Sequence, residues 1–185
     1  YLEEGKLRLN LSTRVLDDGV AAETIHSVQL NRWQHITATY DGSKTPGGMR
    51  VYIDGVSQEL EGLLDLVGNR LPQRYPLRIG ASGSSKPTFQ GNLDDVRIYD
   101  RVLTPEEVAV LATVDSISQI ARIDGGDRTT AQSDKMRLSF LNQYASPDIR
   151  AAYSEVKKLE RERKHTWDGF PTVMVMEEMF PRRPT

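Results

Sequence analysis

Alternation of apolar and polar side chains dominates the first hundred residues of this chain. In the string KLRLNL, Leu7, Leu9 and Leu11 stand at every second position with polar residues between them. A period of two places alternate side chains on opposite faces of a β-strand. The same pattern recurs in the short stretches WQHITATY, MRVYIDG, PLRIGAS and NLDDVRIY. This half of the chain is therefore predicted to be an antiparallel β-sandwich.

Turn residues separate these stretches. Asp54-Gly55 follows a β-branched, aromatic run and precedes a short apolar one, which is the strongest hairpin signal in the chain. Asp41-Gly42 and the string TPGG (Thr45 to Gly48) predict a second, longer turn. No long helical pattern lies between the predicted strands, and this excludes a parallel α/β sheet for this half.

The period changes at Leu103. Thr104-Pro105-Glu106-Glu107 predicts the start of a short helix, because it offers an N-cap threonine, a proline in the first turn and a glutamate that closes a capping box. A second helix is expected over about 130–144, and a third after Ser146-Pro147. The apolar residues of the third helix follow helical spacing: Ile149, Ala152, Tyr153, Val156 and Leu159.

Two further stretches close the chain. The run KKLERERKHT mixes acidic and basic residues, so we interpret it as a solvated helix face with i,i+4 ion pairs rather than as a binding patch. The stretch from Trp167 onward is β-branched and Met-rich, and it predicts an extended strand that needs a partner elsewhere.

Composition excludes several classes of site. The sequence has no cysteine, so it holds no disulfide, zinc–thiolate site, thiol nucleophile or C-x-x-C-H haem motif. A net charge of −2 argues against a nucleic-acid partner. No apolar run approaches the roughly 18 residues of a membrane span. The sequence starts at Tyr1 in mid-pattern, without an initiator Met or a signal peptide, which suggests a piece of a longer chain.

Three strings resemble the laminin-G-like, concanavalin A-like superfamily, especially its bacterial members. They are WQHITATYDG (Trp33 to Gly42), MRVYIDG (Met49 to Gly55) and FQGNLDDVRIYDRVLTPEEV (Phe89 to Val108), in this order and spacing. The resemblance implies a two-sheet jelly roll whose last strand is Leu93–Tyr99, followed by a short closing helix. Family members carry more strands before the equivalent of Lys6. We therefore expect residues 1–113 to be a partial, N-terminally truncated laminin-G-like sandwich, with a C-terminal helical extension.

The second half resembles a domain of unknown function found beside lectin-like modules in large planctomycete proteins, which commonly also carry a cytochrome c-like domain. The matching residues are Arg128-Thr129-Thr130, the helical stretch after them, and PTVMVMEEMFPRRPT (Pro171 to Thr185). The resemblance implies that residues 114–185 are a helical linker and the start of a following domain. It also implies an exported, extracytoplasmic parent protein whose haem motif lies elsewhere.

Two adjacent acids, Asp94 and Asp95, interrupt the last predicted strand. Alternation puts Asp94 on the side of Val96 and Ile98, where an unpaired carboxylate would be unfavourable. A bulge could turn the Asp94 side chain outward, or hydrogen-bond donors could pair with its carboxylate. A structural calcium ion could also bind it, and the resemblance implies such an ion because relatives of this fold hold calcium through an acid on this strand. Both interpretations stay open. The pair cannot serve as glycosidase carboxylates, because adjacent strand residues point to opposite faces.

No catalytic motif occurs in the sequence. E-x-D-x-E, G-x-S-x-G, H-E-x-x-H and phosphate-loop patterns are all absent, so we expect neither enzymatic activity nor a cofactor in this segment, the calcium aside. Trp33, Tyr40 and Tyr52 stand at positions that normally serve the core of such a sandwich. Tyr75, in the loop NRLPQRYP, is the candidate for a ligand contact at the rim.

Three functions remain open. The preferred hypothesis is a non-catalytic lectin-like recognition or scaffolding module of a large exported bacterial protein, in contact with other domains of the same polypeptide and with a glycan or a protein. The second is a structural assembly subunit that binds another protein chain and no sugar. The third is a part of an enzyme or electron-transfer protein, such as a c-type cytochrome, whose active site lies outside this segment.

Overall fold

The computed structural model describes residues 2–14, 18–65, 80 and 89–168. They fall into two compact units, residues 1–136 and 137–185, and each is described by itself. The elements of the first unit are β1 (Leu2–Glu3), β2 (Lys6–Arg14), β3 (Asp18–Thr24), β4 (Ile36–Tyr40), η1 (Pro46–Gly48), β5 (Met49–Ile53), β6 (Val56–Ser57), β7 (Leu60–Asp65), α1 (Pro105–Ala112) and α2 (Ile117–Ile120). Helix α3 (Thr130–Ser139) crosses the boundary, and η2 (Phe140–Tyr144) and α4 (Pro147–Asp168) belong to the second unit.

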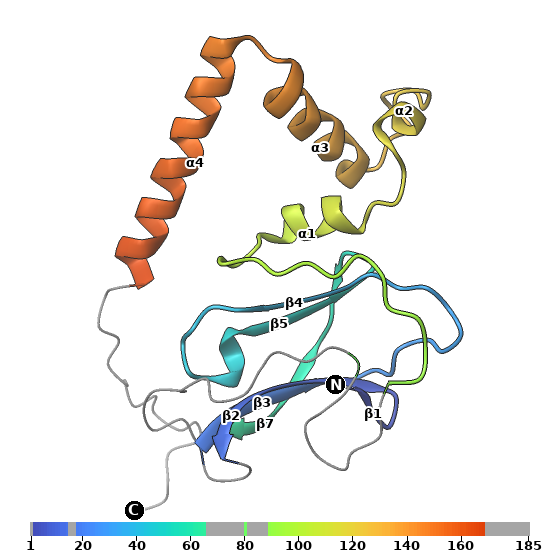
Figure 1. Ribbon diagram of the computed structural model, residues 1–185, viewed down its shortest axis with the longest axis vertical. Helices are drawn as coiled ribbons and strands as arrows, with labels where there is room; N and C mark the ends of the chain where they lie inside the picture. The colour runs from blue at the N-terminus through green and yellow to red at the C-terminus, as the bar shows by residue number, and fades with distance from the viewer. Residues whose placement is uncertain (1, 15–17, 66–79, 81–88, 169–185) are drawn as a thin grey trace, which may run out of the picture. The chain divides into compact units, whose positions relative to one another are not determined.

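Two antiparallel sheets confirm the predicted fold class. One has the strand order β1-β2-β3-β7 and the other β4-β5-β6, and every pairing is antiparallel. Figure 1 shows them as two layers. Between β3 and β7 the register shifts at Leu63, a bulge that adds one residue to β7.

The core lies between the two sheets. Val20 and Ala22 on β3 and Met49 on β5 form one buried cluster, each no more than 1% exposed. Leu9 and Leu11 pack against the same cluster, and their pairing with Ala22 and Val20 in the ladder puts all four on one face of the sheet. The alternation in KLRLNL therefore marks the inner face of the sandwich, as predicted.

Strand β5 is buried on both faces, which a single period-two pattern does not suggest. Met49 faces the other sheet, whereas Tyr52 packs with Leu103 and Val108 in a second cluster. Val108 belongs to α1, so this helix covers the outer face of the three-stranded sheet (Figure 1). The helix begins as predicted: the Thr104 hydroxyl accepts the Glu107 amide at 3.3 Å, and the Glu107 carboxylate accepts the Thr104 amide at 3.0 Å.

The Asp54-Gly55 hairpin is confirmed between β5 and β6. Both residues have positive φ, +50° and +82°, as a type I′ turn requires. A Cβ on Gly55 would lie 3.1 Å from the Ala109 Cα and 3.2 Å from the Ala112 Cβ. Glycine at this turn therefore serves both the backbone conformation and the close approach of α1.

The outer face of the four-stranded sheet carries an ion-pair cluster. The Glu23 carboxylate accepts hydrogen bonds from Arg8 Nη2 at 2.6 Å and from Lys6 Nζ at 3.3 Å, and Arg8 Nη1 also pairs with Glu3 at 2.5 Å. Lys6, Arg8 and Glu23 share this face because each alternates with an inward-facing neighbour. The hydrogen bond from Arg8 is the main reason that the pKa of Glu23 lies below its usual value.

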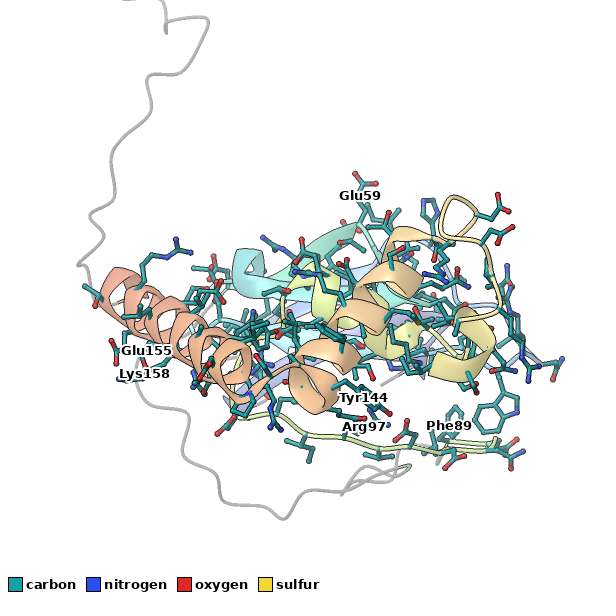
Figure 2. The ribbon with its side chains drawn as sticks, turned by 90° about the horizontal axis from the view of Figure 1, so that it is seen from above. Glu59, Phe89, Arg97, Tyr144, Glu155 and Lys158 are labelled. Carbon is teal, nitrogen blue, oxygen red and sulfur yellow. The ribbon has the colours of Figure 1, made fainter. Side chains whose placement is uncertain are left out.

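The lowered pKa of Glu23 predicts a pH dependence of stability. A carboxylate whose pKa is lower in the folded state stabilises the fold above the pKa of the unfolded chain, and this contribution is lost as pH falls through the folded-state pKa. We therefore expect Glu23→Gln to lower stability at pH 7 and to flatten the decline of stability below about pH 4.5. Urea unfolding from pH 7 to pH 3 measures both effects. The control is Glu59→Gln, the same substitution at an exposed side chain that projects into solvent (Figure 2) and lies outside this cluster. Parallel profiles for the wild type and Glu23→Gln would contradict the assignment.

The helical part agrees with the prediction and adds one element. The predicted helix over 130–144 is α3, ending in the π-helical turn η2, and α4 starts at Pro147 as expected. Helix α2 was not predicted, although Ser116 and Gln119 form a complete capping box there. In the middle of α3, Lys135 Nζ donates to the carbonyl oxygens of Thr113 and Asp115 at 2.6 and 2.8 Å and so ties this helix to the segment after α1.

The prediction that Leu93–Tyr99 forms the last strand of the sandwich is wrong. The described residues 89–102 form no ladder, and Leu93, Val96 and Ile98 are more than half exposed. A strand exists only when a neighbour supplies its hydrogen bonds, and alternation in the sequence does not specify that neighbour. Conversely, β3 and β7 are paired strands that no alternating string had indicated. The predicted strand PLRIGAS (apart from Gly80) lies outside the described residues, and so does the predicted C-terminal strand after its first two residues, Trp167 and Asp168, which belong to α4 instead.

Candidate functional site

An exposed indole stands on the loop that joins β3 to β4. Trp33 is 64% exposed, and Leu30 in the same loop is 74% exposed. The β4–β5 ladder starts only at Ile36 opposite Ile53, so Trp33 precedes the paired part of the strand. The expectation that Trp33 belongs to the core is therefore wrong, because side chains beyond the end of a ladder have no facing sheet to cover them.

The same expectation is confirmed for the two tyrosines. Tyr52 is 5% exposed in the cluster with Leu103 and Val108. Tyr40 packs against the core between the sheets, and its hydroxyl accepts the Lys44 amide at 2.6 Å. The buried Tyr52 ring is therefore not available to stack on a ligand.

Asp54 of the β5–β6 hairpin holds the Trp33 loop in place. Its Oδ1 accepts the His35 amide at 2.8 Å, its Oδ2 accepts Arg32 Nη2 at 3.3 Å, and its own amide donates to the His35 carbonyl at 2.8 Å. Arg32 Nη1 in turn donates to Gln29 Oε1 at 2.8 Å. The loop is thus fixed at several points by a turn whose own geometry is constrained, and this pre-organises its surface.

The side chains of this surface suit a polar, ring-shaped ligand. An exposed tryptophan gives a large apolar face at small loss of conformational freedom. Arg32 and Gln29 are close to Trp33 in the loop and carry hydrogen-bond donors and an acceptor that would suit hydroxyl groups. Loops on rigid sandwiches commonly carry binding residues. We call Gln29, Arg32, Trp33 and Asp54 the Trp33 surface.

The two acids predicted as metal ligands lie elsewhere, in an exposed segment. Asp94 Oδ1 accepts the Asp95 amide at 2.8 Å, and Asp95 Oδ1 accepts Arg97 Nε at 2.7 Å (Figure 2 labels Arg97). The hydrogen bond to Asp95 raises the pKa of the Arg97 guanidinium, so this residue stays protonated. Asp95 has a backbone φ of +51°, and both acids are exposed. Neither carboxylate is therefore buried, and neither needs a partner to offset the loss of solvation that was expected for Asp94.

Calcium takes six to eight oxygen ligands. Within the described part of the chain, no three His, Cys, Asp or Glu side chains come together as a metal-binding group. Calcium binding at Asp94 or Asp95 stays a prediction, and no step below depends on it. Tyr75 lies outside the described residues.

Two antiparallel sheets packed around a shared core define a β-sandwich. The comparison with known families agrees: residues 1–109 match a laminin G-type family described as the concanavalin A-like lectin/glucanases superfamily. This chain belongs to that family.

Curated relatives match over about half of the chain. The protein named Sushi, von Willebrand factor type A, EGF and pentraxin domain-containing protein 1 is 34% identical in Rattus norvegicus and 33% identical in Mus musculus, each over 95 residues. The match covers 47% of this chain and only 3% of either relative. The activities of those whole proteins therefore do not carry over.

A solved structure also matches at low similarity. It is an S-layer domain-containing protein from Clostridium thermocellum, 21% identical, with a TM-score of 0.35 and coverage of 59% of this chain and 52% of that one. We draw no functional argument from it. Among the described residues, no helix combines the length and apolarity needed to cross a membrane.

Proposed function

We propose that this chain is a non-catalytic recognition module that binds carbohydrate through the Trp33 surface. The observation that carries the proposal is the exposed indole on a loop fixed by Asp54. A sugar ring would stack its apolar face on Trp33, while Arg32 and Gln29 would donate hydrogen bonds to its hydroxyl groups. Laminin G-like domains are generally non-catalytic, which agrees with a role in binding.

A glycan array tests this function. We expect the wild-type chain to bind a set of glycans, and Trp33→Ala to lose at least about tenfold in affinity, because the stacking surface is gone. Leu30→Ala, in the same loop and also well exposed, is the matched control and should bind as the wild type does. Both substitutions are at the surface, so urea unfolding should differ from the wild type by no more than about 0.5 kcal/mol.

The array is run with calcium and with a chelator. A response that needs calcium and disappears in Asp94→Asn/Asp95→Asn would support a metal at those acids; a response that is equal in both buffers would argue against a role for calcium in binding. Undiminished binding by Trp33→Ala would contradict the proposed surface. No response in either buffer would contradict carbohydrate recognition as a whole.

A second candidate function is assembly with another protein chain. It is favoured by residues 93–99, where Leu93, Val96 and Ile98 are exposed and no ladder forms among the described residues. A segment with unpaired backbone groups and exposed apolar side chains can accept a strand from another chain. An array without any response would favour this function over the first.

The wider context is also a proposal. We propose that the sandwich ends at Thr113, that residues 114–185 join it to a following domain, and that the parent is an extracytoplasmic multidomain protein of the planctomycete type. The support is the resemblance of the Arg128-Thr129-Thr130 and Pro171–Thr185 strings to such proteins. The complete reading frame tests it. A C-x-x-C-H motif in the parent, with a haem absorbance band in the native protein, would support a c-type cytochrome, and their absence would contradict it.

A further inference from the structure

Helix α4 carries an exposed apolar stripe. Ile149, Val156 and Leu159 are 47%, 50% and 54% exposed, and Ala152 between them is exposed as well. Their spacing of three and four residues puts them on one face of the helix. From Ile149 to Leu159 the stripe is about 15 Å long, at 1.5 Å rise per residue, and Arg163 ends it one turn later.

The second unit covers only one edge of this helix face. The turn η2 packs against α4, and the shallow hollow between them is lined by Leu141, Asn142, Arg150, Tyr153, Ser154 and Lys157. The Lys157 ammonium lies 5.8 Å above the centre of the Tyr153 ring on this side. The described residues of the unit thus cover the Tyr153 side and leave the stripe open.

Ion pairs along α4 do not replace the missing packing. Lys157 pairs with Glu160 at 3.0 Å and Lys158 with Glu155 at 3.4 Å, the latter pair lying side by side in Figure 2. Their side chains are 41–57% exposed, and such pairs contribute only a few tenths of a kcal/mol. Helices in proteins owe most of their stability to packing of an amphipathic face. The open stripe is therefore a surface that a partner could cover.

The charges beside the stripe indicate what can cover it. Asp148, Glu155 and Glu162 recur every seven residues and form a row along one edge, each three or four positions from a stripe residue. On the opposite edge Glu160 lies next to Val156, beside Tyr153, and this edge also carries Arg150 and Lys157, the latter paired with Glu160. In a pair of identical helices these edges would bring carboxylates against carboxylates in an antiparallel arrangement, and Glu155 against Glu160 in a parallel one. The pattern therefore disfavours a second copy of the chain.

We propose that the α4 stripe binds a basic amphipathic helix of a partner protein, of about three turns, whose apolar residues cover Ile149, Val156 and Leu159 and whose Lys or Arg residues meet the acidic row. Helix-in-groove recognition of this kind uses apolar anchors at i, i+3, i+4 and i+7 for affinity and flanking charges for specificity. Lysines of the partner would compete with Lys158 for Glu155. Breaking the Lys158–Glu155 pair would cost little free energy, because both side chains are exposed to solvent.

Fluorescence anisotropy with two synthetic helices tests the proposal on the whole 185-residue chain. Both peptides carry Leu at the a and d positions of about three heptads; one has Lys at e and g, and the other has Glu there. We expect the Lys peptide to bind at least about tenfold more tightly than the Glu peptide, with a difference that shrinks as salt is raised.

Three variants assign the binding to the stripe and its acidic edge. Val156→Gln/Leu159→Gln should weaken the Lys peptide at least about tenfold, because the apolar anchors are lost. Glu155→Lys/Glu162→Lys should reverse the preference toward the Glu peptide. Arg161→Glu, a charge reversal on the far side of α4, is the control and should change neither affinity by more than about twofold. Far-UV circular dichroism verifies that each variant keeps its helix content.

Several outcomes would overturn the proposal. Equal affinity for the two peptides, or binding that survives Val156→Gln/Leu159→Gln, would show that α4 does not select a basic helix through this stripe. Light scattering coupled to size exclusion provides the remaining test. Dimerisation of the chain at micromolar concentration that Val156→Gln/Leu159→Gln abolishes would assign the stripe to a second copy instead.

Discussion

Met49→Ala is expected to lower the free energy of unfolding of the sandwich by about 2–5 kcal/mol. Met49 is 1% exposed and reaches from β5 to Val20 and Ala22 on the other sheet. Truncation to alanine removes buried surface and leaves a cavity at the point where the two sheets meet. Domains of this size have about 5–15 kcal/mol of stability in total, so the loss should be a large part of it.

Urea unfolding followed by far-UV circular dichroism measures this loss. Met49→Leu nearly preserves the side-chain volume and should cost less than about 1.5 kcal/mol. Val56→Ala, at a position 64% exposed on β6, should stay within about 0.5 kcal/mol of the wild type. If Met49→Ala were no more destabilising than Val56→Ala, the two sheets would not share the core described above.

Gly55→Ala is expected to lower the free energy of unfolding by about 1–3 kcal/mol. Two effects add at this position. An alanine at φ +82° is strained, and its Cβ would come within 3.1 Å of the Ala109 Cα, a backbone atom of α1 that cannot rotate away. Relief of the contact would shift α1 away from its place over Tyr52 and Leu103.

Two other glycines separate the effects. Gly42 has φ +84° with no atom within 4 Å of an added Cβ, so Gly42→Ala measures the conformational strain alone. Gly126 has open space and no positive φ, so Gly126→Ala measures neither effect. We expect losses in the order Gly55, Gly42, Gly126, determined by urea unfolding. Equal losses for Gly55→Ala and Gly42→Ala would contradict the close approach of α1 to the hairpin.

Local patterns predicted the elements that depend on neighbouring residues. The hairpin at Asp54-Gly55 and the capping box at Thr104 and Glu107 involve groups a few positions apart, and both are present with the expected geometry. The α4 boundary at Pro147 follows from the same kind of signal. In each case the residues that determine the conformation are also the ones that make the hydrogen bonds, so no distant partner is needed.

Features that depend on distant partners were harder to predict. Residues 93–99 alternate as well as KLRLNL does, yet only KLRLNL pairs, because β3 supplies its hydrogen bonds. Likewise the string around Trp33 does not show that the ladder ends at Ile36 and leaves the indole exposed. The tie between Asp54 and His35, nineteen positions apart, has no signature in the sequence at all.

The amino-acid sequence alone thus determined the sandwich class, the inner face of β2, the turn at Gly55 and the amphipathic character of α4, because periodicity and turn chemistry act over a few residues. Only the tertiary structure decided which apolar side chains are covered. Burial of Met49 and Tyr52 and exposure of Trp33 and Val156 depend on what packs opposite each residue, and this is set by the meeting of segments far apart in the chain.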